Sequence, residues 1–185
     1  MDLVHRRSCH GRRLDGRNKG GGEGDGGGHG FGGSREPKGS RAGRYSRIRI
    51  ATDGSSCSAL AGRHAIYLAK KLGWELFVLY AVDVARAFRL GVHFGEAVAE
   101  LERFGEHAAA RIREMAEKSG VRCEERVMSG RPHEAIIAAS EEIEADLVVV
   151  GSTGGMTSVR RVLIGSESEK VLHYCKRPVL LVRDA

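Results

Sequence analysis

Short apolar runs alternate with longer amphipathic segments between residues 47 and 182, and this alternation limits the possible folds more than any other feature. Strand and helix that alternate in this way predict an α/β fold, a five-stranded parallel sheet with helices on both faces. Residues 83–95 mix Arg, Phe, Gly and His and favour no single element. We expect strands at 47–52, 75–82, 121–128, 146–150 and 178–182, and helices at 59–72, 95–119, 132–143 and 166–175.

The ends of the predicted helices carry the residues that usually stand there. Ser55 or Ser56 fits the N-cap of the first helix, and Gly73 fits its C-terminal end. Gly120 closes the second helix, and Pro132 opens the third. These residues support the element boundaries independently of the apolar pattern.

Glycine and charge are distributed unevenly and separate an N-terminal extension from a folded domain. Residues 1–44 hold 14 of the 26 glycines, and their ten Lys or Arg against five Asp or Glu give +5 of the chain's net +6. With almost no aliphatic side chains, this segment cannot bury enough apolar area to offset its chain entropy. We expect residues 1–44 to be a disordered Gly/Arg-rich extension and residues 45–185 to form one domain.

Composition also limits the class of protein. We find neither a signal peptide nor the roughly 18 consecutive apolar residues of a membrane span, so we expect a cytoplasmic protein. The extension lacks repeated Arg-Gly-Gly units and has Phe31 as its one stacking ring, so we do not expect it to bind nucleic acid. Widely spaced cysteines argue against a disulfide framework or a zinc site; they are Cys9, Cys57, Cys123 and Cys175.

A glycine-rich segment from Gly151 to Ser168 follows the apolar run 147–150 and leads into the last predicted helix. Glycine allows the backbone to approach a ligand closely, and N–H groups at a helix start favour negative charge. Ligands of parallel sheets bind at the edge formed by the carboxyl ends of the strands. Residues 52–54, at the end of the first predicted strand, lie at the same edge. The pattern indicates a site for nucleotide phosphates. The alternative is an ordinary strand-to-helix connection whose glycines serve tight turns.

Other common chemistry is excluded by specific residues. A Walker A loop needs Gly-Lys-Ser/Thr, which does not occur, and the Gly-x-Gly-x-x-Gly match at Gly22 has no strand before it. A Gly-x-Ser-x-Gly nucleophile turn is missing too, and His64 and His107 have no partner at metal-ligand spacing. We therefore expect no catalytic residue, no metal bound by protein side chains, and a protein that is not an enzyme.

Several sequence blocks in order resemble the universal stress protein (UspA) family over about residues 46–183. The resemblance is to the ATP-binding branch, and it implies a Rossmann-like fold of the adenine nucleotide alpha hydrolase-like group. The blocks are Ile50-Ala-Thr-Asp-Gly-Ser55, Leu79-Tyr-Ala-Val-Asp83, Gly130-Arg-Pro-His-Glu-Ala-Ile136, Ala145-Asp-Leu-Val-Val-Val-Gly-Ser152, the glycine-rich segment and Arg177-Pro-Val-Leu-Leu-Val182.

This resemblance implies a dimeric stress-response regulator or sensor that binds ATP, with Mg or Mn carried by the nucleotide. Glycine backbone would surround the phosphates and ribose, serine hydroxyls would bind phosphate, and Asp53 and the backbone near Ala81 would lie beside the base. The final strand, Val179–Val182, would pair with its copy in a homodimer and so cover an exposed edge. The expected nucleotide-binding residues are Ala51, Thr52, Asp53, Ala81, Gly151, Gly154, Gly155, Gly165, Ser166 and Ser168.

The chain departs from the family's nucleotide signature, Gly-x2-Gly-x9-Gly-Ser/Thr. Gly154 follows Gly151 after two residues, as the signature requires, whereas the required nine residues separate Gly155, and not Gly154, from the final glycine. One residue is therefore inserted between the two parts of the signature. Ala51 replaces a common proline, and Glu167 replaces a small apolar residue and would repel phosphate if it turned inward. Two alternatives stay open: a family-like dimer that does not bind nucleotide, and a nucleotide-hydrolysing enzyme of the related α/β group.

Four cationic or titratable side chains lie near the predicted site. Arg160 and Arg161 stand between the glycines, and Arg131 and His133 follow the third strand. Each is able to approach a phosphate. The sequence favours the simpler interpretation that the arginines at 160 and 161 form a solvated face and that His133 is a surface residue opening a helix.

Overall fold

The computed structural model describes residues 6–7, 45–89, 94–153 and 164–183. Contacts divide the chain into two units, of which the first joins Met1–Cys9 with Tyr45–Ala185 and the second is His10–Arg44. The second unit lies outside the described residues, so the fold below is that of the first.

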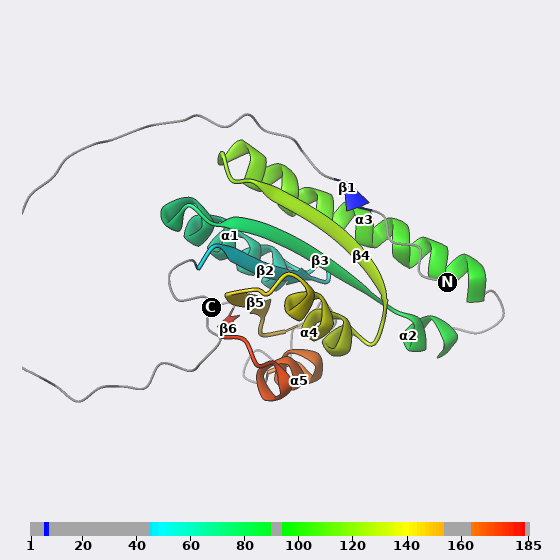
Figure 1. Ribbon diagram of the computed structural model, residues 1–185. Coiled ribbons are helices and arrows are strands. Elements are labelled where there is room, and N and C mark those ends of the chain that lie inside the picture. The colour runs from blue at the N-terminus through cyan, green and yellow to red at the C-terminus, as the bar shows by residue number, and fades with distance from the viewer. Residues whose placement is uncertain (1–5, 8–44, 90–93, 154–163, 184–185) are drawn as a thin grey trace, which may run out of the picture. The chain divides into compact units, whose positions relative to one another are not determined.

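Strand and helix alternate along the described chain, as the sequence predicts (Figure 1). The sheet order is β1-β4-β3-β2-β5-β6, with β2 to β6 parallel and β1 antiparallel to β4. The predicted five-stranded parallel sheet is therefore confirmed. The elements are β1 (Arg6–Arg7), β2 (Arg47–Thr52), α1 (Ser56–Leu72), β3 (Glu75–Asp83), α2 (Val84–Arg89), α3 (Phe94–Lys118), β4 (Cys123–Gly130), α4 (Pro132–Glu142), β5 (Leu147–Gly151), α5 (Ser166–Tyr174) and β6 (Val179–Val182).

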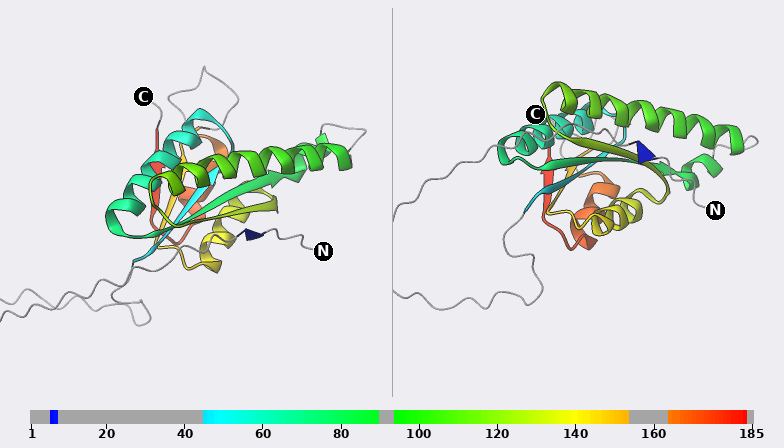
Figure 2. Two further views of the ribbon diagram at one scale, coloured as in Figure 1. Left: turned by 90° about the horizontal axis from the view of Figure 1, so that it is seen from above. Right: turned by 45° about the horizontal axis from the view of Figure 1, so that its top comes forward.

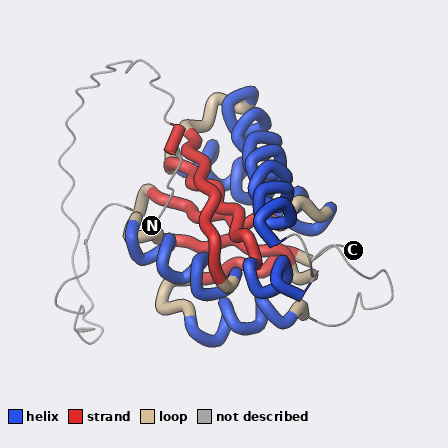
Figure 3. Tube along the Cα trace, turned by 90° about the vertical axis from the view of Figure 1, so that its right-hand side faces the viewer, coloured by secondary structure: helices blue, strands red, loops and turns tan. Residues whose placement is uncertain are grey.

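Helices cover both faces of the sheet, α1 and α3 on one and α4 and α5 on the other (Figure 2). Ile48 and Ile50 of β2 belong to the core on the α1–α3 face, whereas Val148 and Val150 of β5 belong to the core on the α4–α5 face. Successive side chains of a strand point to opposite faces, so β5, which lies between two helical layers, is apolar on both. The strands accordingly run between helices on either side (Figure 3).

The strand order reverses between β2 and β5. From β2 the chain continues to β3 and β4 on one side and then crosses to β5 and β6 on the other. The register pairs Ile48 with Leu147 and Ile50 with Val149, so the carboxyl ends of β2 and β5 lie beside each other. Ligands of open α/β sheets bind in the crevice at this reversal point.

The ends of α1 follow the predicted capping chemistry. Ser55 is the N-cap, and its hydroxyl accepts a hydrogen bond from the Ser58 N–H at 3.1 Å. The helix therefore begins at Ser56, three residues before the predicted start. Gly73, at φ +70°, ends the helix in the left-handed conformation that favours glycine.

Two segments differ from expectation. The region 83–95, for which the sequence favoured no element, contains helix α2 and the first residues of α3. In the N-terminal extension Arg6–Arg7 form a strand against β4, so the expected disorder does not hold for these two residues. The remainder of 1–44 lies outside the described residues, where disorder stays a prediction. None of the helices described here is long and apolar enough to cross a membrane.

Candidate functional site

The predicted site residues that the structure describes gather at the carboxyl edge of the sheet. They come from the end of β2, the end of β5 and the start of α5, while Ala81 follows the β3 residue that pairs with Thr52. Gly154, Gly155, Arg160 and Arg161 lie outside the described residues.

The residues after β2 form a tight turn held by their own side chains. The Thr52 hydroxyl lies 3.0 Å from the Ser58 hydroxyl and accepts a hydrogen bond from the Gly54 N–H at 3.2 Å. The exposed Asp53 accepts the Ser55 N–H at 3.0 Å, and Gly54 takes the left-handed φ of +80°. Thr52 is therefore a structural residue of the turn, and the turn presents Asp53 to solvent.

Gly151 is a glycine because the start of α1 packs directly on the end of β5. A Cβ at this position would lie 3.1 Å from Cys57 Sγ and 3.2 Å from the Ser58 nitrogen, closer than most Cβ contacts. The Cys57 thiol in turn donates to the Val182 carbonyl of β6 at 3.5 Å. This packing accounts for Gly151 without a ligand, and it places the N-terminus of α1 beside β5.

Two hydrogen bonds fix the start of α5 to the same strand end. The Gly165 N–H donates to the Ser152 carbonyl at 2.7 Å, and the Ser168 hydroxyl donates to the Gly151 carbonyl at 2.7 Å. Gly165 is the N-cap of α5, and Ser166 is exposed. The positive ends of α1 and α5 thus lie together at β5, an arrangement suited to an anion.

Glu167 points toward α4. Its Oε2 accepts hydrogen bonds from the His133 N–H at 3.0 Å and pairs with His133 Nδ1 at 2.8 Å, while its Oε1 accepts from Lys170 Nζ at 2.8 Å. His133 opens α4, as the sequence predicts, but its side chain is only 15% exposed and paired with this carboxylate, so it is not a free surface residue. The sequence does not show this contact, since α4 and α5 meet only in the fold.

Partial burial raises the pKa of Glu167, but hydrogen bonds from Lys170 and His133 outweigh it and lower the pKa to about 2. A carboxyl whose folded pKa is depressed stabilises the fold above its unfolded pKa, and this contribution disappears as the pH falls toward the folded value. The free energy of unfolding of the wild type should therefore exceed that of Glu167→Gln at pH 7. We expect the difference to shrink between about pH 4.5 and pH 2. Urea unfolding across this range measures it, and a difference independent of pH would contradict the assignment.

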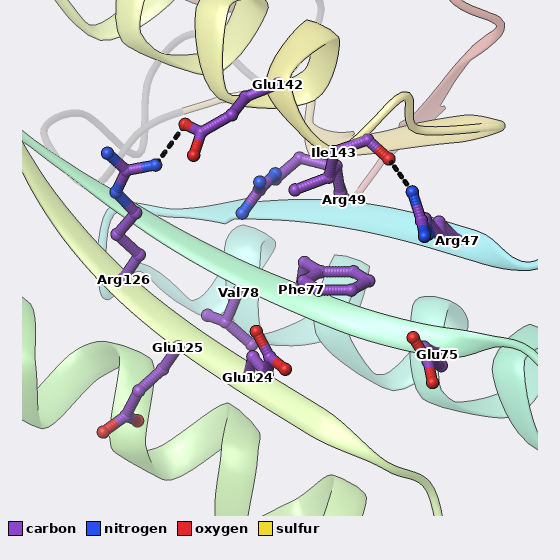
Figure 4. Close-up of a pocket in the computed structure, with 10 residues that line it drawn as sticks. All are labelled: Arg47, Arg49, Glu75, Phe77, Val78, Glu124, Glu125, Arg126, Glu142 and Ile143. Atoms are coloured by element: carbon purple, nitrogen blue, oxygen red, sulfur yellow. Dashed lines mark hydrogen bonds and ion pairs between the residues drawn. The ribbon is translucent and has the colours of Figure 1, made fainter. Parts of the chain in front are cut away.

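A hollow of about 500 Å³ lies over the amino-terminal halves of β2, β3 and β4, away from the predicted site (Figure 4). Arg49 donates to the Ala139 carbonyl at 2.8 Å, and Arg47 donates to the Ile143 carbonyl at 2.8 Å. These cations satisfy the C-terminal end of α4, whose last turn has no basic residue of its own. Arg126 pairs with Glu142 nearby, so both basic and acidic side chains line the hollow. This mixture favours a structural role for the arginines over anion binding.

Sequence reasoning missed two further residues of the site. Lys170 lies three residues after Glu167, a helical spacing at which opposite charges pair, so this contact was available from the sequence. Cys57 contacts Ser152, with Sγ and Oγ 3.8 Å apart, but no spacing rule connects two residues so distant in the chain.

Residues 44–183 match the model of the Universal stress protein family. The chain belongs to the universal stress protein family. Universal stress protein MJ0531 of Methanocaldococcus jannaschii is 37% identical over 141 residues, covering 75% of this chain and 82% of that protein. Universal stress protein YxiE of Bacillus subtilis is 30% identical over 148 residues, covering 75% of this chain and 99% of that protein.

Solved structures of the family share the fold. The structure of the hypothetical protein MJ0577 superposes with a TM-score of 0.68 at 25% identity, over 76% of this chain and 97% of that one. A universal stress protein crystallised in complex with cAMP gives a TM-score of 0.55 at 27% identity, over 75% of this chain and 97% of that one. The family and the fold predicted from the sequence are both confirmed.

Proposed function

We propose that this family member binds ATP or a related adenine nucleotide at the carboxyl ends of β2 and β5. The observation that carries the proposal is the start of α5, which two hydrogen bonds of 2.7 Å, from the Gly165 N–H and the Ser168 hydroxyl, hold at the end of β5 with Ser166 exposed. Backbone N–H groups at such a helix start bind phosphate. The cAMP complex of a relative supports an adenine nucleotide as the ligand.

The residues would divide the nucleotide between them. The backbone N–H and the hydroxyl of Ser166 would hold phosphate, and Gly165 would leave room for its approach, together with the glycine segment around Gly154 and Gly155. Asp53 and the backbone near Ala81 would lie on the base side. Ser168 donates its hydroxyl to Gly151, so it would support the helix start unless phosphate competes for that hydroxyl. Mg²⁺ or Mn²⁺ would arrive with the nucleotide and neutralise its phosphates.

We propose binding without assigned catalysis, in a cytoplasmic dimer that responds to bound nucleotide. Ser55 acts as a helix cap, which supports its interpretation as a structural residue and not a nucleophile. Strand β6 stands last in the sheet order, so Val179–Val182 offers an edge for a second copy. Sedimentation velocity of the full chain measures this part of the proposal separately.

Release of bound nucleotide tests the proposal directly. The purified full chain should release an adenine nucleotide on denaturation, and Mg-ATP should raise the unfolding temperature of the emptied protein. At a free nucleotide concentration 100 times the Kd, binding stabilises the folded state by about 2.7 kcal/mol. Mg-GTP serves as the control for base selectivity. If no nucleotide is released and Mg-ATP gives no shift, the alternative of a family member that does not bind nucleotide is correct.

A further inference from the structure

The starts of α4 and α5 are joined by a row of charged and polar side chains. Arg131 pairs with Glu134 at 3.1 Å, His133 Nε2 lies 3.9 Å from Glu134, and His133 Nδ1 lies 2.8 Å from Glu167. Lys170 ends the row at 2.8 Å from Glu167. The row connects the second residue of α4 with the second residue of α5, directly beside the proposed phosphate position.

The contact between Glu167 and His133 fixes which atoms donate and which accept hydrogen bonds. Both oxygens of Glu167 accept hydrogen bonds from α4 or from Lys170, one turn further along α5. Because an ionised carboxylate only accepts hydrogen bonds, the Nδ1 atom of His133 must carry a proton. The His133 side chain is only 15% exposed, so most of the ring is enclosed by the protein.

The position of Glu167 makes this contact relevant to phosphate binding. A glutamate in the first turn of a helix, when unpaired, is attracted to the positive helix end and the N–H groups there. The N–H groups from Ser166 onward are the ones that a nucleotide phosphate would use, since the Gly165 N–H donates to the Ser152 carbonyl. A carboxylate released from α4 would therefore compete with phosphate and repel it.

We propose that His133 is a positioning residue of the nucleotide site: with Lys170 it holds the Glu167 carboxylate against α4 and leaves the start of α5 to the phosphates. This inference rests on the proposed function. It explains how the chain tolerates an acidic residue next to Gly165 and Ser166. It also makes the affinity for a nucleotide depend on the number of its phosphate charges.

Calorimetric titration of the full chain with Mg-ATP and with AMP tests the inference. His133→Ala removes the hydrogen bond from the ring and keeps the one from the backbone N–H, so it should loosen the Glu167 carboxylate without freeing it fully. Mg-ATP binding should weaken about tenfold and AMP binding about threefold, because the loosened carboxylate repels the larger charge more. Adding Glu167→Gln to His133→Ala should restore Mg-ATP affinity to within about twofold of Glu167→Gln alone, since the competing charge is gone. His133→Asn keeps a side-chain N–H near the Nδ1 position and should bind like the wild type. His107→Ala, an exposed change on α3, is the matched control.

Thermal unfolding of each variant verifies that it is folded before titration. If His133→Ala does not fold, His133→Leu takes its place, since it fills the space of the ring and donates no hydrogen bond to Glu167. Equal losses for Mg-ATP and AMP, or no rescue by Glu167→Gln, would overturn the inference and reduce His133 to a structural residue. A wild type that binds neither nucleotide would instead remove the proposed function, and this inference with it. A wild type that binds both, with unchanged variants, removes the inference alone.

Discussion

Replacement of Gly105 by alanine should lower the free energy of unfolding by about 2 kcal/mol, since overpacking a core costs up to about 3 kcal/mol and the better helix propensity of alanine recovers about 1. Gly105 is buried where α3 crosses β3, and a Cβ there would overlap Tyr80 Cδ1 and lie 2.8 Å from its Cε1. Tyr80 is only 7% exposed and meets the Phe104 ring edge-on, with centroids 6.0 Å apart, so its ring has little room to move.

Gly95 supplies the matched control in the same helix. A Cβ at Gly95 has no heavy atom within 4 Å, so Gly95→Ala should stabilise the protein by about 0.5 kcal/mol through helix propensity alone. Urea unfolding followed by circular dichroism measures both variants. If the two substitutions changed the free energy of unfolding by similar amounts, helix propensity, and not the contact with Tyr80, would determine the effect at Gly105.

The sequence predicts the sheet well because its strands lie between two helical layers. A strand such as β5 is apolar throughout, and Ser55 and Gly73 have local capping roles at the two ends of α1. The short helix α2 was not predicted, since six residues are too few to show a helical period. The antiparallel β1 was not predicted either, because two residues carry no pattern and their partner lies more than 100 residues away.

The sequence predicts that the candidate site residues lie at one edge of the sheet, but it does not predict their side-chain contacts. Parallel strands bring the residues after β2 and β5 to one edge, so Asp53 and the Gly165–Ser166 pair were expected together. The orientation of Glu167 could not be predicted, because it depends on His133 from another helix. The sequence left open whether Glu167 turns toward the phosphates. In the fold it turns toward α4.

The glycines of the site also differ in why they are glycines. Gly54 has a left-handed φ, and Gly151 meets the start of α1, so protein geometry explains both. Gly165 has φ −65° and ψ 145°, an extended conformation that any residue adopts. Its N–H bond to Ser152 requires no particular side chain. The backbone therefore does not require glycine at position 165, and close approach of a ligand is a reason that the proposed function supplies.

Gly165→Val should for this reason separate stability from binding. Without ligand we expect a loss of only about 0.5–1 kcal/mol, the difference between a glycine and an apolar N-cap. Mg-ATP binding should weaken about 100-fold, or about 2.8 kcal/mol, because the isopropyl group would occupy the place of a phosphate. Urea unfolding of the empty protein and calorimetric titration measure the two effects.

The milder Ser166→Ala removes one hydroxyl without adding volume, and a weakening of about tenfold is expected from the loss of one hydrogen bond to a charged group. The test depends on Gly165→Val losing more Mg-ATP affinity than Ser166→Ala, and less on the size of either loss. If Gly165→Val bound Mg-ATP as tightly as the wild type, no phosphate would approach the start of α5, and Gly165 would have no role in binding. If it instead unfolded the protein, an unseen packing constraint would explain the glycine. Loss of binding in a stable variant is the result that only a ligand at this helix start produces.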